Sequence, residues 1–81
     1  MGMLRVLSRQ GDAQFEWDSG AAESGDPEAL AAIAEAERIF AEGWARGARA
    51  YIALPDGRYV RTDRLVRDAR EIVVIPPVFG G

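Results

Sequence analysis

Apolar and polar positions at the start of the chain alternate with a period of two on either side of a turn. Residues 4–7 are mainly apolar, the turn-forming run Gln-Gly-Asp follows at 10–12, and residues 13–18 alternate between apolar and polar side chains. A period of two places alternate side chains on opposite faces of a strand. The pattern therefore predicts an opening β-hairpin.

The next stretch carries the start and stop signals of an α-helix. Asp26 suits the N-cap, Pro27 the first helical position and Glu28 the acidic first turn. Gly47 is the residue type that most often ends a helix. We expect a helix of about five turns between these signals.

The predicted helix is apolar on one side only. Its apolar arc consists of Ala29, Ala32, Ile33, Ala36, Ile39, Phe40, Gly43 and Trp44. Its charged side consists of Glu28, Glu35, Arg38, Glu42 and Arg46. Glu42 and Arg46 have the spacing of a favourable ion pair. We expect the helix to pack on a sheet by its apolar side, and we interpret Trp44 as a core residue.

Three more strands are predicted after the helix. The turn sequence Leu-Pro-Asp-Gly at 54–57 separates one strand from a second that runs through Tyr59 and Val60. Residues 62–71 are polar apart from an apolar pair, Leu65 and Val66, that we expect to be buried, and they allow a single helical turn. The apolar run at 71–75 is typical of a strand buried on both faces, so we expect it in the middle of the sheet.

The order of these elements predicts one fold. A hairpin, a crossover helix and a late central strand suit a mixed sheet whose last strand lies parallel beside the first, with the helix across one face. We therefore predict an α+β protein with a β-grasp fold, a mixed sheet of four to five strands packed on one helix. The domain covers residues 1–75, and residues 76–81 form a projecting, flexible tail because two prolines end the last strand.

The composition excludes much of the chemistry that enzymes use. The chain has 81 residues, no Cys, no His and no Lys, because all ten basic residues are Arg. Thiol nucleophiles, imidazole bases and Schiff-base amines are therefore absent. Asp56, Asp63 and Asp68 occupy turn-like positions without a recognisable ligand spacing, which disfavours a metal or acid–base site.

Charge and hydropathy limit the partners. A net charge of −3 disfavours nucleic acid, and we expect the arginines at 58–70 to form a solvated rim paired with Asp63, Asp68 and Glu71. No apolar run reaches the length needed to span a membrane, and the opening residues lack the apolar stretch of a signal peptide. We expect a cytoplasmic protein that binds no membrane.

With this predicted topology, the chain resembles ubiquitin-like proteins. Its ending, Glu-Ile-Val-Val-Ile-Pro-Pro-Val-Phe-Gly-Gly at 71–81, is similar to that of the small subunit of molybdopterin synthase and related sulfur carriers. The resemblance implies a carrier with no catalytic residue, metal or cofactor of its own. It implies that a ubiquitin-activating-type adenylyltransferase uses ATP to activate the carboxylate of Gly81.

The resemblance also implies the roles of the tail residues. Gly80 and Gly81 would be the site of activation and conjugation, because a chain without Cβ atoms can thread a narrow channel. The residues that the activating enzyme recognises would be Pro76, Pro77, Val78 and Phe79. The prolines reduce the entropy lost when the tail docks.

Two fates of the activated glycine stay open. In a sulfur carrier it becomes a thiocarboxylate and serves a sulfur-acceptor enzyme; in a protein modifier it reaches a target amine, with a conjugating enzyme and a protease as further partners. The two-proline ending favours the carrier, whereas the long loop at 18–27 and the long helix favour a bacterial modifier. A modifier without lysine cannot build lysine-linked chains of itself.

The alternative is a β-grasp interaction or adaptor domain whose tail is never activated. In ubiquitin-like proteins the sheet face away from the helix binds partners. Candidates for that face here are Arg5, Gln14, Glu16, Arg49, Tyr51 and Tyr59. Val78 and Phe79 are candidates for apolar contacts from the tail.

Overall fold

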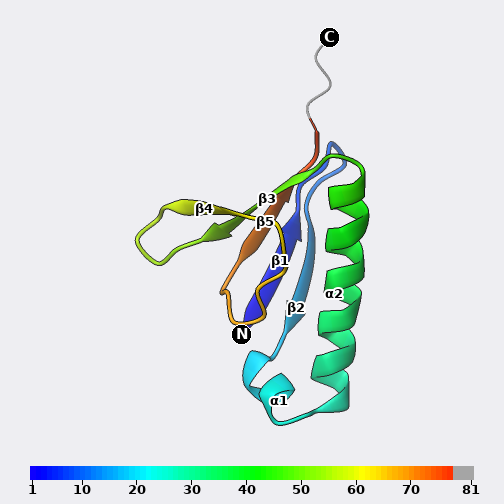
Figure 1. Cartoon of the computed structure of the whole chain (residues 1–81), viewed down its shortest axis with the longest axis vertical. Helices are drawn as coiled ribbons and strands as arrows, with labels where there is room; N and C mark the ends of the chain where they lie inside the picture. Colours follow the sequence, from blue (N-terminus) through cyan, green and yellow to red (C-terminus); the bar gives the residue numbers. More distant parts are fainter. Residues whose placement is uncertain (78–81) are drawn as a thin grey trace.

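The computed structural model describes residues 1–77 and shows two β-hairpins, two helices and a final strand (Figure 1). The strands are β1 (Gly2–Val6), β2 (Ala13–Trp17), β3 (Arg49–Ala53), β4 (Tyr59–Thr62) and β5 (Ile72–Ile75). The helices are α1 (Ser19–Glu23) and α2 (Pro27–Ala45). Neither of these helices is long and apolar enough to cross a membrane.

All five strands belong to one mixed sheet with the order β2-β1-β5-β3-β4. β5 lies parallel to β1, with Leu4 opposite Ile72, and antiparallel to β3, with Tyr51 opposite Val73. The hairpins β1-β2 and β3-β4 are antiparallel. α2 runs along one side of the sheet (Figure 1). The predicted α+β fold of the β-grasp type, with the last strand central and parallel to the first, is confirmed.

The core fills the space between α2 and the sheet. Its buried residues are Leu4, Trp17, Ile33, Ala36, Phe40, Ala48, Ala50, Ile72 and Val74. Small residues on α2 allow close packing: a Cβ at Gly43 would lie 3.5 Å from Cγ1 of Val74. The predicted apolar arc is confirmed, because four of its members, Ala29, Ile33, Ala36 and Phe40, are buried in the helix.

Both ends of α2 follow the predicted signals. The Oδ2 atom of Asp26 accepts a hydrogen bond of 3.0 Å from the N–H of Ala29, which satisfies one free donor of the first turn. After the last turn, Gly47 has a φ of 98°, a conformation that costs glycine little. Its N–H donates to the carbonyl of Trp44 at 3.0 Å, and the following N–H of Ala48 completes a Schellman motif.

The segment predicted to be a long loop at 18–27 contains the short helix α1. Asp18 is its N-cap, and Oδ1 of this residue accepts a hydrogen bond of 3.0 Å from the N–H of Ala21. Small residues follow the cap and permit a compact turn of helix. The prediction of a plain loop was therefore wrong for this segment.

The ion pairs of α2 also differ from the prediction. Arg38 bridges Glu35 and Glu42, and its Nη1 atom lies 2.6 Å from Oε1 of Glu42. Arg46 is the C-cap residue and lies past the last helical residue, so the predicted pair between Glu42 and Arg46 does not form. Arg38, in the middle of the helix, can reach one carboxylate on the turn before it and one on the turn after it.

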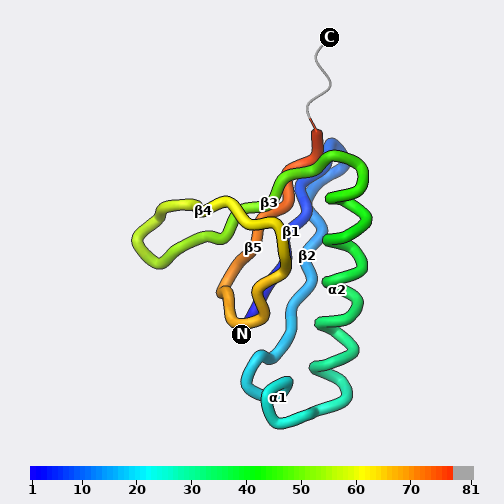
Figure 2. Tube along the Cα trace, viewed as in Figure 1, coloured from blue at the N-terminus to red at the C-terminus, as the bar shows by residue number. Residues whose placement is uncertain are grey.

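The β3-β4 hairpin and the segment that follows β4 lie on different sides of the molecule. The β3-β4 hairpin extends away from α2 (Figure 2), and Tyr59 and Val60 are 61% and 47% exposed. The segment 63–71 forms turns and not the helical turn that the sequence allowed. It returns beside α2, and its residues Leu65 and Val66 pack against the core.

Candidate functional site: the open face of the sheet

The side of the sheet away from α2, here called the open face, follows from the alternation of side chains. Leu4, Ile72 and Val74 point toward α2, so their neighbours along each strand point the other way. One row in register crosses all five strands and consists of Gln14, Arg5, Val73, Tyr51 and Arg61. The open face therefore has an apolar centre with an arginine on each side.

An apolar hollow of about 370 Å³ lies at the centre of this face. The residues that line it are Leu7, Tyr51, Tyr59, Val73 and Ile75. Val73 is only 9% exposed, whereas Ile75 is 38% exposed. Single exposed apolar residues are ordinary, but apolar residues gathered around one hollow are typical of a surface that binds a protein. We call these five residues the sheet hollow.

The arginines beside the hollow differ in their surroundings. Nη2 of Arg5 lies 3.1 Å from Oε2 of Glu71, and both side chains are partly covered, at 34% and 23% exposure. Arg61, across the face, is exposed and forms no ion pair with any residue between 1 and 77. The surface therefore suits a partner with an apolar contact and a carboxylate beside it.

β5 carries the chain directly from the sheet hollow to the tail. The strand ends at Ile75, because proline has no N–H to continue the ladder. Pro77 packs beside the turn between α2 and β3, where its Cβ lies 3.8 Å from the position that a Cβ on Gly47 would take. The other predicted tail residues, Val78, Phe79, Gly80 and Gly81, lie outside the described residues, and their roles stay predictions.

The predicted candidates for the open face are only partly brought together. Tyr51 and Tyr59 share the sheet hollow, while Gln14 and Glu16 are exposed on the edge strand β2 and do not line it. Arg49 turns back toward the helix: its guanidinium lies 5.2 Å from the centre of the Trp44 ring, and its Nη1 donates to the carbonyl of Ala48 at 3.0 Å.

Sequence reasoning missed the apolar residues of the hollow. Val73 and Ile75 belong to a run that reads as wholly buried, and Leu7 lies just past β1. Its N–H nevertheless donates to the carbonyl of Val74 at 3.0 Å, which extends the parallel pairing by one residue. The alternation of side chains along β1 could have predicted this face, because it places Arg5 and Leu7 on one face of the sheet and Leu4 on the other.

Two of the arginines at 58–70 form exposed ion pairs with acidic residues close in sequence, and Arg67 pairs with the more distant Glu37. Arg58 pairs with Asp56 at 2.7 Å and Arg64 with Asp63 at 3.8 Å. The predicted pairs with Asp68 and Glu71 are not formed among the described residues; Glu71 pairs with Arg5 instead. In the part of the chain that the structure describes, no three acidic residues gather as metal ligands would.

Comparisons of the chain with protein-family models, with curated proteins and with solved structures give no match. A functional proposal for this chain must therefore rest on its own fold and surface. Within residues 1–77 that surface offers an apolar hollow with an arginine on each side.

Proposed function

We propose that this chain is a ubiquitin-like carrier or modifier protein, activated at the carboxylate of Gly81 by a partner adenylyltransferase. The observation that supports this most strongly is the path of β5: Val73 and Ile75 line the sheet hollow, and two prolines follow directly. A partner docked on the open face would therefore also lie beside Pro76 and Pro77, where the tail begins. The six residues after Ile75 span at most about 20 Å when extended, so the tip stays within reach of that partner.

The proposed activation is an acyl transfer in which the chain supplies only its terminal carboxylate. A carboxylate oxygen of Gly81 attacks the α-phosphorus of ATP, the acyl-adenylate forms and pyrophosphate leaves. A sulfur or nitrogen nucleophile then attacks the acyl carbon, and AMP leaves with the bonding electron pair. Neither step needs a basic or nucleophilic side chain from this protein, which suits a chain without Cys, His or Lys.

The nucleophile decides between the two proposed fates. A sulfur donor gives a thiocarboxylate at Gly81, which a sulfur-acceptor enzyme consumes. A thiol of a conjugating enzyme gives a thioester. A target amine then attacks the thioester and forms an amide bond with Gly81, which a protease can hydrolyse. In either case Gly80 and Gly81 enter the enzyme's channel, and Pro76, Pro77, Val78 and Phe79 form its recognition segment. ATP belongs to the partner, and we assign this chain no cofactor.

A second candidate is an adaptor that binds partners without activation of the tail. The sheet hollow supports it, because an apolar surface of this kind can hold a partner on its own. The two functions differ in what they need. A carrier needs both the open face and Gly81, whereas an adaptor needs only the face.

The test begins with intact mass spectrometry of the protein purified from its native host. A mass that corresponds to a chain ending at Gly81, with one oxygen replaced by sulfur in part of the sample, identifies a sulfur carrier. Target peptides that carry a Gly-Gly remnant on an amine identify a modifier. A chain that does not end at Gly81 after maturation contradicts the proposal.

Two variants then separate carrier from adaptor in host extract with ATP. Deletion of Gly81 should abolish the modified forms and leave binding partners in place, while Tyr51→Arg should weaken both. If the parent chain shows no modified forms, deletion of Gly81 leaves partner binding and the host phenotype unchanged, and Tyr51→Arg alone is harmful, the adaptor is the correct function.

A further inference from the structure

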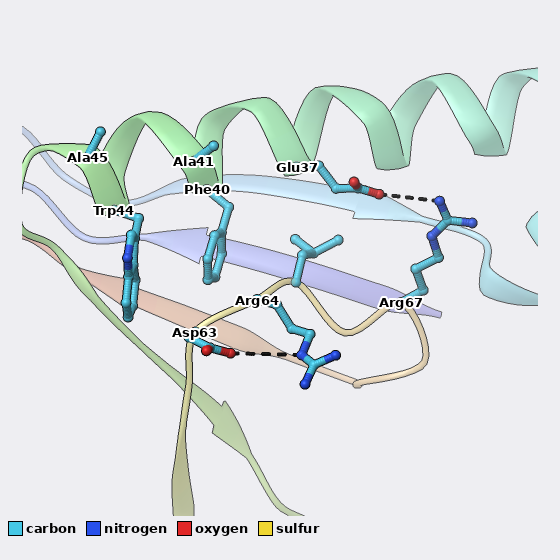
Figure 3. Close-up of a pocket in the computed structure, with 9 residues that line it drawn as sticks. Glu37, Phe40, Ala41, Trp44, Ala45, Asp63, Arg64 and Arg67 are labelled. Atoms are coloured by element: carbon cyan, nitrogen blue, oxygen red, sulfur yellow. Dashed lines mark hydrogen bonds and ion pairs between the residues drawn. The ribbon is translucent and has the colours of Figure 1, made fainter.

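A separate groove lies on the α2 side of the sheet, between the helix and the segment that follows β4 (Figure 3). It has a volume of about 530 Å³. The lining residues that matter here are Phe40, Trp44, Asp63, Arg64, Leu65 and Arg67. A second depression continues from Trp44 to Arg61, so the groove is elongated. We call this combined surface the helix groove.

The floor of the helix groove is aromatic. Phe40 and Trp44, one turn apart on α2, stack with their ring centres 6.1 Å apart and an angle of 8° between the ring planes. Phe40 is buried, whereas Trp44 is only partly covered. The interpretation of Trp44 as a core residue is thus correct for one side of its ring. Because Phe40 stacks with this ring and the guanidinium of Arg49 lies over it at 5.2 Å, a side chain from outside would contact the part of the indole that these two residues leave exposed.

The wall opposite α2 is held in place before any ligand arrives. The indole Nε1 of Trp17 donates to the carbonyl of Arg67 at 2.8 Å, and Oγ1 of Thr62 donates to the carbonyl of Arg64 at 2.8 Å. Leu65 packs against the core between these two points. A wall fixed in this way loses little conformational entropy when a ligand binds.

The rim of the groove carries cations that a ligand can recruit. Arg64 is 3.8 Å from Asp63 and Arg67 is 3.4 Å from Glu37, and all four side chains are about half exposed or more. Exposed pairs of this kind contribute little, so the guanidinium groups can turn to other carboxylates at small cost. The chain as a whole has a net charge of −3, but Arg61, Arg64 and Arg67 lie along one side of the groove. These arginines can attract anionic groups of a ligand.

We propose that the helix groove binds a short acidic segment of a partner protein, with one large apolar side chain against Phe40 and Trp44 and carboxylates on Arg61, Arg64 and Arg67. The elongated shape suits an extended peptide. Glu37 and Asp63 on the rim would repel the continuous phosphates of a nucleic acid, whereas a peptide can place its carboxylates between them. This site does not use the sheet hollow or the tail, shares only Arg61 with the row across the open face, and goes beyond the proposed function.

The experiment uses two displayed peptide libraries of one length, selected against the full chain. In the first library one Phe, Leu or Trp is flanked by Asp and Glu; in the second it is flanked by Lys and Arg. The acidic library should yield binders and the basic library should not. Perturbation of the indole N–H signal of Trp44 on titration, with the amide signal of Gly11 in the turn between β1 and β2 as internal reference, should place the peptide in the helix groove.

Charge reversal then tests the arginines. The double variant Arg64→Glu and Arg67→Glu should weaken the selected peptide about tenfold or more, a loss that removal of two interfacial charges can produce. Arg9→Glu with Arg58→Glu makes the same change of charge outside the groove and should leave affinity within about twofold.

Three results would overturn the proposal. These are an acidic library that yields no binders or no more than the basic one, bound peptides that perturb Tyr51 and Val73 instead of Trp44, and equal losses in the two double variants. Because the spectral mapping uses the unmodified chain, it decides the question even if the variant at Arg64 and Arg67 fails to fold.

Discussion

The indole Nε1 of Trp17 donates a hydrogen bond of 2.8 Å to the carbonyl oxygen of Arg67, a residue 50 positions later in the chain. Trp17 is 2% exposed and ends β2, while Arg67 belongs to the wall of the helix groove. One buried side chain therefore joins the first hairpin to the segment before β5. Because Trp17 is fixed in the core, the hydrogen bond also fixes the position of the groove wall at Arg67.

Trp17→Phe should destabilise the protein and loosen the wall. The substitution keeps an aromatic ring but leaves the carbonyl of Arg67 without its donor and the core with less volume. We expect a loss of about 1–3 kcal/mol in the free energy of unfolding, measured by denaturant titration. Amide hydrogen exchange at 65–69 should accelerate more than in α2. Uniform acceleration throughout the domain would show that the bond has no particular effect on the wall.

Gly2→Ala should be destabilising although Gly2 lies at the start of a strand. Gly2 is opposite Trp17 in register, and a Cβ at this position would lie 2.3 Å from the indole ring. Since the ring is buried, it cannot move aside cheaply, and we expect a loss of about 1–3 kcal/mol. Gly20→Ala in α1 is the matched control. Its Cβ would meet only Oδ1 of Asp18 at 3.5 Å, so stability should stay equal or rise. Equal thermal stability of the two variants would contradict this prediction.

Asp26→Ala should cost more than Asp18→Ala, although both aspartates cap a helix. Asp26 caps the 19-residue helix α2, which supplies much of the core, whereas Asp18 caps the five-residue helix α1, which has no buried residue. Loss of the cap on α2 should lower the free energy of unfolding by about 1 kcal/mol. The effect at Asp18 should be smaller, because α1 can fray without disturbing the core. Chemical denaturation of both variants tests the order.

Arg38 should make stability depend on pH in the acid range. The hydrogen bond from the Arg38 guanidinium lowers the pKa of the Glu35 carboxyl below its ordinary value of 4.5. A lowered pKa in the folded state stabilises the protein fully above the unfolded value, and this contribution is lost as pH falls through the folded value. Arg38→Ala should therefore lose less melting temperature than the parent chain between about pH 6 and pH 3. High salt should reduce the difference, because both groups are exposed. Identical pH profiles of melting temperature in the two proteins would show that the pair of Arg38 and Glu35 does not contribute to stability.

Much of the fold could be predicted because its strongest signals are local. The cap at Asp26, the glycine at 47 and the period of the helix all act within a few residues, and each is found as expected. The central position of β5 followed from its continuous apolar sequence. The pair between Arg38 and Glu42 was missed because three charges on adjacent turns offer several partners, and only side-chain geometry selects among them.

The surfaces were harder to predict because they depend on contacts distant in sequence. Ile72 and Val73 are equally apolar, yet one faces α2 and the other the sheet hollow; the parallel register with β1 makes this difference. The helix groove needs Trp44 and Arg64 side by side. The apolar pair Leu65 and Val66 indicates that the segment after β4 touches the core, but not that it lies beside α2. The hydrogen bond from Trp17 that fixes this return spans most of the domain.

Tyr51→Arg should separate the open face from the stability of the fold. Tyr51 lies between Val73 and Arg61 in the row across the sheet and is only partly covered, so an arginine can extend into solvent with little loss of packing. It would add a third cation to Arg5 and Arg61 beside the sheet hollow and remove an aromatic contact, and we expect ATP-dependent modification of the tail in host extract to slow about tenfold or more. Val60→Arg is the control, because this residue is exposed on the other face of the same hairpin. Modification should continue at the parent rate in that variant, and a parallel decline in both would indicate a general effect of charge and not a docking surface.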